Sequence, residues 1–339
     1  MPEAEARSLE QELDRRAQDG DNDAIEFFRL HGATKTYLSR AYYPWIQAKC
    51  SYFTEHGEPH INAVIQAASH MLEAYLRPNS ALGLSTLDIY LILTSILWHD
   101  VGNVTGREGH ADKVTELSNE IRTLAFPNLV VSRMVSSIVK AHGGRNGLTI
   151  PRTDQAVATH HANYNVFPKA LAAIVRLSDE VSENHNRVDP AMLPHIPAEN
   201  RIFWEYANCI PYAAVDPSRE RIVVEVALPE DRASQRYLCP EPVPGKDESG
   251  YITLIEYVLY RLEKMNNERI YCAREFGRYL ACREVHVRFA IHDEAADVMS
   301  TSVVFGDGGV RKDDYPDVRV ASAFFEEHPN WAPERLRQQ

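Results

Sequence analysis

The sequence predicts a mainly α-helical protein with a smaller α/β region toward its C-terminal end. Three observations carry this prediction. Apolar residues recur at helical spacing in several segments before residue 189, and the uninterrupted apolar stretch 89–98 predicts a fully buried helix. After residue 189, two segments instead have the alternating, β-branched composition of strands. With 339 residues, of which 44% are hydrophobic, the chain can form one large domain or two ordinary ones.

The N-terminal region, residues 1–52, is predicted to be helical and to pack on the core. Residues 7–30 are polar and weakly periodic, which predicts one or two surface helices interrupted near Gly20. The aromatic-rich stretch 37–53 is expected to cover the apolar core.

Residues 53–189 are predicted to form the helical core. A helix begins at Pro59 and stops before Pro78, and the sequence Ser85-Thr86-Leu87-Asp88 resembles a capping box that starts the buried helix. Gly102 lies just beyond the expected end of that helix. Residues 148–166 are expected to be a long loop or short helical pieces. Three more helices are predicted at about 110–125, 130–141 and 167–183.

The remaining residues, 190–339, are predicted to form an α/β subdomain of two strands and a long helix. Several prolines punctuate its first part, and strands are expected at 221–228 and 284–291. Between them, residues 251 to about 281 predict one long amphipathic helix. We expect this subdomain to cap a site on the core or to form the surface of a homodimer.

Composition limits the classes of partner. A net charge of −12 argues against a protein whose main task is to grip duplex nucleic acid, but it permits a small phosphorylated substrate held by a local metal charge. No run approaches the roughly eighteen apolar residues of a membrane helix, and residues 1–5 lack the features of a secretory signal. The five cysteines follow no metal-binding or disulfide spacing, so reduced thiols in a cytoplasmic protein are expected.

His99 and Asp100 are the residues that point most directly to a function. They follow the buried helix, so a histidine and a carboxylate must find partners in a dry environment. A divalent transition metal would satisfy both, because neutral imidazole and ionised carboxylate are preferred ligands for such ions. Four further candidate ligands stand at the ends of, or within, other predicted helices: His60, His110, His142 and Asp179.

Each assignment has a competing interpretation. His99 and Asp100 could form a buried hydrogen-bonded pair without a metal. His110 could be a solvent-exposed residue at a helix start, and His142 could be a residue favoured by the dipole at a helix end. At the other positions the competing side chains are His56 and His70 for His60, Glu180 for Asp179, and the pair His160 and His161 as further ligands or pocket residues.

Five short sequences around these residues resemble the HD superfamily of metal-dependent phosphohydrolases: PHINAV, ILWHDVGN, GREGHADKV, IVKAHGG and IVRLSDEVSENHNRV. The resemblance spans residues 53–189 and implies a helical-bundle HD domain there. It implies that a first metal is held by His60, His99, Asp100 and Asp179. His110 and His142 match the additional histidines of two-metal members, in which Asp100 would bridge the ions. The flanking regions are most similar to the HD domains of bacterial defence and signalling loci.

The resemblance implies a nucleotidase or phosphodiesterase. Metal-bound hydroxide would attack a phosphate ester or anhydride of a nucleotide-like substrate, with one or two Mn, Fe, Co, Ni or Zn ions in the site. Asp100 and His110 would then be catalytic, together with the cationic residues Lys140 and Arg187. Four cationic residues stand near the ligands in the sequence and are candidate phosphate contacts: Lys140, Arg145, Arg176 and Arg187. His160 and His161, eighteen residues before Asp179, are candidates for lining the substrate pocket.

Two other functions fit the same residues. A mixed-valent diiron oxygenase on the same scaffold would use the six ligands to cleave a C–C or C–P bond. A non-catalytic nucleotide sensor would use residues 190–339 as its interaction surface. Iron and O₂ dependence without phosphate release identifies the oxygenase, and nucleotide binding without turnover identifies the sensor.

Overall fold

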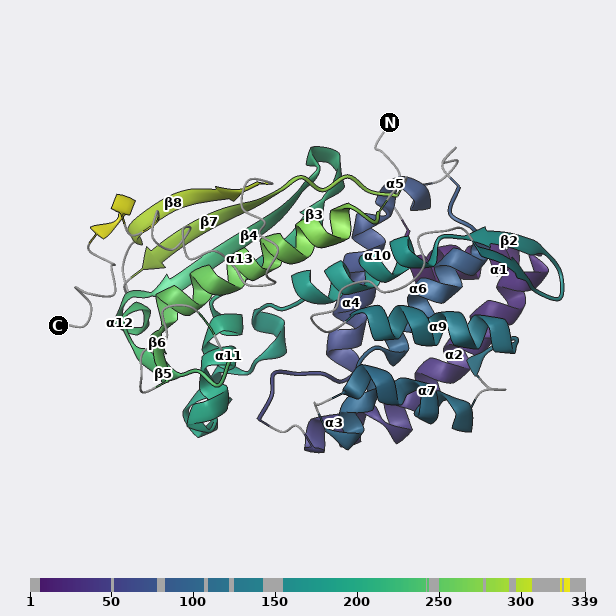
Figure 1. Ribbon diagram of the computed structural model, residues 1–339, viewed down its shortest axis with the longest axis horizontal. Helices are drawn as coiled ribbons and strands as arrows, with labels where there is room; N and C mark the ends of the chain where they lie inside the picture. The colour runs from purple at the N-terminus through teal and green to yellow at the C-terminus, as the bar shows by residue number, and fades with distance from the viewer. Residues whose placement is uncertain are drawn as a thin grey trace. The chain divides into compact units, whose positions relative to one another are not determined.

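The computed structural model confirms a mainly α-helical protein with a smaller α/β part (Figure 1). Contacts divide the chain into two compact units, the first made of residues 1–51, 56–182 and 271–281, and the second of residues 52–55, 183–270 and 282–339. The structure describes residues 7–49, 52–77, 83–106, 109–121, 125–142, 155–241, 243, 250–276, 279–292, 297–306, 324 and 326–329.

Helix α6 (Thr86–Trp98) is the central element of the first unit, and all of its residues are buried. Its start is the predicted capping box: the Ser85 hydroxyl accepts a hydrogen bond from the Asp88 amide, and the Asp88 carboxylate accepts one from the Ser85 amide. Because the helix is apolar on every side, it is stable only when other helices surround it. The helices that contact it are α1 (Leu9–Gln18), α2 (Asn22–Ala41), α4 (Glu58–Met71), α9 (Leu129–His142) and α10 (Pro168–Val181).

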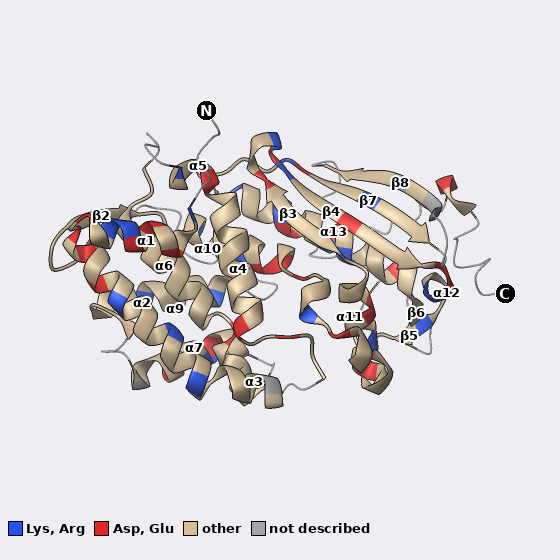
Figure 2. Cartoon of the chain, turned by 180° about the vertical axis from the view of Figure 1, so that it is seen from behind, with Lys and Arg blue, Asp and Glu red and all other residues tan. Residues whose placement is uncertain are grey.

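The other predicted helices of this unit are also present. Gly20, with a positive φ of 88°, separates α1 from α2 as expected. Asp88 is the one charged residue of α6, whereas α1 and α2 carry several acidic and basic residues (Figure 2). The remaining described helices of the unit are α3 (Tyr43–Lys49), α5 (Glu73–Leu76), the 3-10 helix η1 (Val101–Thr105) and α7 (His110–Glu120).

One segment of the first unit differs from the prediction. The described part of residues 148–166 is an antiparallel hairpin of β1 (Gln155–Ala158) and β2 (Asn163–Val166), not a loop or short helical pieces. The hydroxyls of Thr159 and Tyr164 each donate a hydrogen bond of 2.8 Å to the Asp23 carboxylate at the start of α2. The hairpin is therefore held by a residue far away in the sequence, which no local pattern reveals.

The second unit contains a four-stranded sheet in the order β3-β4-β7-β8. The predicted strands are confirmed as β4 (Arg221–Pro229) and β7 (Glu284–His292), which pair in parallel. Antiparallel edge strands not expected from the sequence flank them, β3 (Tyr212–Asp216) and β8 (Asp297–Phe305). Alternate residues of β4 are buried, as a strand with one apolar face requires.

The long helix of this region is shorter than predicted. Residues 251–281 were expected to be one helix, but Tyr251–Thr253 form strand β6, paired with β5 (Arg236–Leu238), and helix α13 covers only Leu254–Ala273. Thr253 and Glu256 exchange hydrogen bonds at the helix start, which is a capping arrangement that fixes this boundary.

Several short helices of the second unit were not expected: η2 (His185–Arg187), η3 (Pro190–His195), α11 (Ala198–Asn208), η4 (Pro217–Arg219) and α12 (Glu230–Ala233). The four described cysteines are buried free thiols. Of the helices that the structure describes, none has both the length and the apolar content needed to cross a membrane.

Candidate metal centre

The site is built at the C-terminal end of α6. His99 caps this helix and is fully buried, and Asp100 is only 4% exposed. The His99 Nδ1 atom lies 2.7 Å from the Ile96 carbonyl oxygen, which can only accept a hydrogen bond. The proton of that bond is therefore on Nδ1, and the Nε2 atom is the one that faces His60, Asp100 and Asp179.

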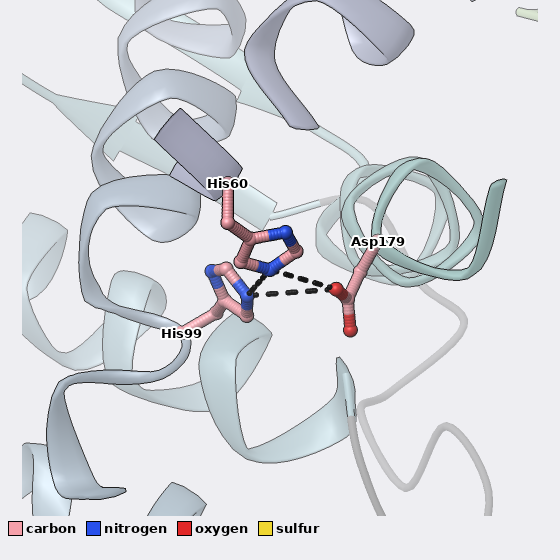
Figure 3. Close-up of side chains that lie close together, drawn as sticks. All are labelled: His60, His99 and Asp179. Atoms are coloured by element: carbon pink, nitrogen blue, oxygen red, sulfur yellow. Dashed lines mark hydrogen bonds and ion pairs between the residues drawn. The ribbon is translucent and has the colours of Figure 1, made fainter. Parts of the chain in front are cut away.

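His60, His99 and Asp179 form the first half of the site, and their side chains point toward one another (Figure 3). The Nε2 atoms of His60 and His99 lie 3.3 Å apart. The Asp179 Oδ1 atom lies 3.2 Å from Nε2 of His60 and 3.7 Å from Nε2 of His99. Three potential ligand atoms thus surround one point.

Helix geometry brings these three residues together. His60 is in the first turn of α4, directly after Pro59, and Asp179 is in the last turn of α10. Helices α4 and α10 pack against each other and both contact α6. Proline at the second position of α4 starts that helix where His60 can face the end of α6.

Asp100, His110 and His142 form the second half of the site. His110 begins α7, and its Nε2 lies 3.5 Å from Asp100 Oδ1. His142 ends α9, and its ring centroid lies 5.1 Å from that of His99 and 5.5 Å from that of His110. The His142 Nδ1 atom donates to the Val139 carbonyl at 2.5 Å, so its Nε2 is the available ligand atom.

Asp100 lies between the two halves. Its Oδ2 atom is 3.4 Å from Nε2 of His99 and 3.7 Å from Nε2 of His60, whereas its Oδ1 atom is the one nearer His110. The Asn103 side-chain amide donates a hydrogen bond of 2.8 Å to Oδ1 and so orients the carboxylate. This supporting role of Asn103 was not predicted from the sequence. An amide side chain three residues after Asp100 is the feature of the sequence that could have predicted it.

Gly102 lies in the short segment that connects Asp100 to His110, and it allows His110 to reach the site. The turn η1 folds back so closely that the Gly102 α-carbon packs on the main chain of His110, with no room for a Cβ. Glycine is therefore required at this position by close approach rather than by an unusual backbone angle.

Asp179 carries a negative charge that a bound cation would neutralise. Burial opposes ionisation of Asp179, but hydrogen bonds from His60 and His99 outweigh it and hold the pKa of this carboxyl well below its usual range. Burial and the nearby His99 lower the pKa of His142 to about 4, so its ring is neutral at pH 7. Burial lowers the pKa of His99, but Asp100 and Asp179 outweigh it and raise the value to about 10.

These protonation states fit a metal centre. Four imidazoles and two carboxylates are a donor set typical of divalent transition metals. Asp179 and His142 already have the protonation state that coordination requires. A proton on Nε2 of His99 stabilises the surrounding carboxylates, and a divalent cation would displace it. We call these six residues, His60, His99, Asp100, His110, His142 and Asp179, the six-residue cluster.

The competing ligands do not join the six-residue cluster. His70 is exposed on α4, and the ring of His56 lies 5.8 Å from that of His60 without belonging to either half. His160 and His161 are exposed at the turn between β1 and β2, and no contact within the described part of the chain links them to the cluster.

The candidate cationic residues have different positions. The Lys140 side chain is 44% exposed, two residues before His142, and pairs with Asp112. The Arg176 Nη1 atom lies 3.4 Å from the carbonyl oxygen of Ala141. Arg187 belongs to the second unit, where its Nε donates to the Glu55 carbonyl, and Arg145 lies outside the described residues.

Comparison with known protein families places the chain in one of them. The model of the HD-CE family matches residues 50–239, which is more than half of the chain and includes all six residues of the cluster. No curated protein matches the chain significantly, and no solved structure does.

Proposed function

The chain belongs to the HD-CE family, and from this membership and the arrangement of the six-residue cluster we propose that it is a metal-dependent phosphohydrolase. The proposed substrate is a phosphate ester or anhydride of a nucleotide-like molecule. The two-sided position of Asp100 is the observation that carries the proposal, because its two carboxylate oxygens face different groups of histidines.

The proposed ligands fall into two sets. His60, His99 and Asp179 would hold one divalent ion, and His110 and His142 a second, with Asp100 shared between them. Bound there, divalent transition metals lower the pKa of water and neutralise charge on phosphoryl oxygens. The chain supplies the rest: Asn103 and the Ile96 and Val139 carbonyls fix the orientation of Asp100, His99 and His142.

Substrate phosphate contacts are proposed for Lys140 and Arg176. Lys140 is exposed and close in sequence to His142, and its only described ion pair is with the exposed Asp112. Arg176 is three residues before Asp179 on α10 and is held at the Ala141 carbonyl beside His142. A cation at either position would neutralise phosphate oxygens as negative charge develops in the reaction.

The experiment combines metal analysis with product release. Protein purified without chelator is analysed for Mn, Fe, Co, Ni and Zn, and phosphate release is measured over a panel of nucleotides and dinucleotides. We expect Asp100→Ala to lose both bound metal and activity. The matched control is Asp19→Ala, whose side chain is 64% exposed at the end of α1 and should leave both unchanged. Full metal content and full activity in Asp100→Ala would overturn the proposal.

The same experiment separates the two other functions. A diiron oxygenase would bind iron, require O₂ and release no phosphate, so assays are run with and without oxygen. A sensor would bind a nucleotide in the presence of every tested metal without converting it. Either result would replace the phosphohydrolase proposal while leaving the metal assignment intact.

A further inference from the structure

A second group of potential metal ligands lies outside the six-residue cluster. Asp23 and Glu26 are one turn apart at the start of α2, and His161 is in the turn of the β1–β2 hairpin. One ligand atom from each of the three lies within 4.8 Å of the others. The sequence suggested His161 as a pocket residue or ligand of the main site, but the structure groups it with α2 instead.

Asp23 is the buried member of this group. It is only 1% exposed, and its Oδ2 accepts hydrogen bonds from the hydroxyls of Thr159 and Tyr164. Its Oδ1 is also buried, yet it has no hydrogen-bond partner among the residues that the structure describes. Within the same described residues, no lysine or arginine pairs with Asp23 or Glu26. A buried carboxylate oxygen without a donor is unfavourable unless a cation compensates it.

This group is distinct from the six-residue cluster because the two lie at opposite ends of α6. The Thr86 hydroxyl, at the start of α6, donates to the carboxylate of Asp21, which caps α2 two residues before Asp23. His99 stands at the other end of the helix. At about 1.5 Å per residue, the helix separates its ends by roughly 20 Å.

We propose that Asp23, Glu26 and His161 bind a divalent transition metal ion, with Zn²⁺ as the closest chemical fit. One imidazole and two carboxylates match the ligands of zinc, whereas Mg²⁺ and Ca²⁺ prefer oxygen donors alone. Three protein ligands, of which His161 is exposed and Glu26 partly exposed, leave coordination positions for water.

The ion would fasten the hairpin turn to α2. Strands β1 and β2 have four residues each, and an isolated two-stranded hairpin of this kind is at best marginally stable. The hydroxyl bonds from Thr159 and Tyr164 already attach the hairpin to Asp23. A shared metal would add a third attachment, through His161, and would use the Asp23 oxygen that otherwise has no described partner.

The test compares His161→Ala with His160→Ala in the full chain. Both residues are exposed in the same turn, so both variants should fold. Zinc content is measured by elemental analysis after equilibration with micromolar free Zn²⁺. We expect His161→Ala and Glu26→Gln each to bind one equivalent less than the wild type, and His160→Ala to match the wild type. Protection of backbone amides in the hairpin should fall in the two metal-deficient variants when zinc is present.

To exclude zinc bound at the six-residue cluster, the same zinc measurements are repeated in a His99→Ala/Asp100→Ala protein. We expect one zinc equivalent to remain in that protein and to disappear on addition of His161→Ala but not His160→Ala. Equal zinc content in wild type, His160→Ala and His161→Ala would overturn the proposal. Because no activity enters these measurements, that result would leave the phosphohydrolase proposal untouched.

Discussion

Gly102 lies directly against the main chain of His110: a Cβ atom at Gly102 would meet the His110 carbonyl oxygen at 1.8 Å and its Cα at 2.9 Å. These contacts are with backbone atoms, which cannot move aside as a flexible side chain could. The turn η1 and the first residue of α7 therefore fit together only with glycine at this position.

Gly102→Ala should displace His110 from the second half of the site. Overpacking of this kind destabilises a protein by about 1–3 kcal/mol, and contact with backbone places this variant at the upper end. Metal analysis should show loss of the ion proposed to bind Asp100, His110 and His142. The control is Gly32→Ala in α2, where nothing lies near the added Cβ; helix propensity predicts a gain of about 0.5–1 kcal/mol there. Equal melting temperatures for the two variants would contradict the prediction.

Asn103→Ala should weaken metal binding without removing a ligand. Its side chain holds Asp100 Oδ1 by a hydrogen bond of 2.8 Å. Loss of such a supporting group typically lowers metal affinity or activity by about 10- to 100-fold. Metal titration of chelator-treated protein measures the effect. Thr105→Ala, in the same short helix, removes only a hydroxyl bonded to the Gly102 carbonyl and should titrate like the wild type.

Asp179→Ala and Glu180→Gln should behave differently although the two residues are adjacent. Asp179 lies near Nε2 of both His60 and His99, whereas Glu180 belongs to neither half of the site. We expect Asp179→Ala to lower activity by more than the roughly 10- to 100-fold typical of losing a group that supports a ligand, with loss of bound metal. Glu180→Gln should retain both. If Glu180→Gln lost its bound metal and Asp179→Ala kept it, Glu180 rather than Asp179 would be the ligand.

Lys140→Ala should raise KM with little change in metal content. A hydrogen bond to a charged group contributes about 1.5–3 kcal/mol, so an increase in KM of about tenfold or more is expected. Arg133→Ala is the matched control, because Arg133 is exposed on the same side of α9, two turns farther from His142. Similar KM values for both variants would exclude Lys140 from the substrate contacts.

Glu10 gives the protein a defined sensitivity to acid. A hydrogen bond from His31 lowers the pKa of Glu10 from 4.5 to about 2; burial opposes this shift, and Lys35 reinforces it. The folded-state pKa is below the unfolded value, so the stabilisation is complete above about pH 4.5 and is lost as the pH falls toward 2.

Glu10→Gln should therefore lower the free energy of unfolding at pH 7, by on the order of 1 kcal/mol after allowance for solvent screening. The difference from the wild type should shrink as the pH falls from about 4.5 to about 2. Urea unfolding at several pH values measures it. Gln11→Ala, on the same helix, removes a side-chain oxygen that accepts from the Ser8 amide and should show a difference that does not depend on pH. A Glu10→Gln difference that stays constant would contradict the prediction.

The helical core could be predicted from the sequence because the residues that start, end and bury each helix are close together in the chain. The capping box at Ser85 and the apolar run that follows it, up to Trp98, determine α6. Likewise, each candidate ligand stands beside a local helix boundary, such as Pro59 before His60. The resemblance of the surrounding motifs to the HD superfamily then indicated which of the histidines are the candidate metal ligands.

The parts that were missed depend on contacts between distant residues. The β1–β2 hairpin is held by Asp23, 136 positions before Thr159, and the segment has no characteristic turn sequence. The edge strands β3 and β8 are defined by pairing with β4 and β7. For the same reason, the proximity of His161 to Asp23 and Glu26 appeared only in three dimensions.

The complete burial of α6 also determines when the proposed metal centre can form. Amide hydrogens exchange with solvent through local openings where a helix has an exposed face, and α6 has none. Its amides should exchange only when the whole first unit unfolds. His99 and Asp100 directly follow this element, so we expect them to meet His60 and Asp179 only in the fully folded unit.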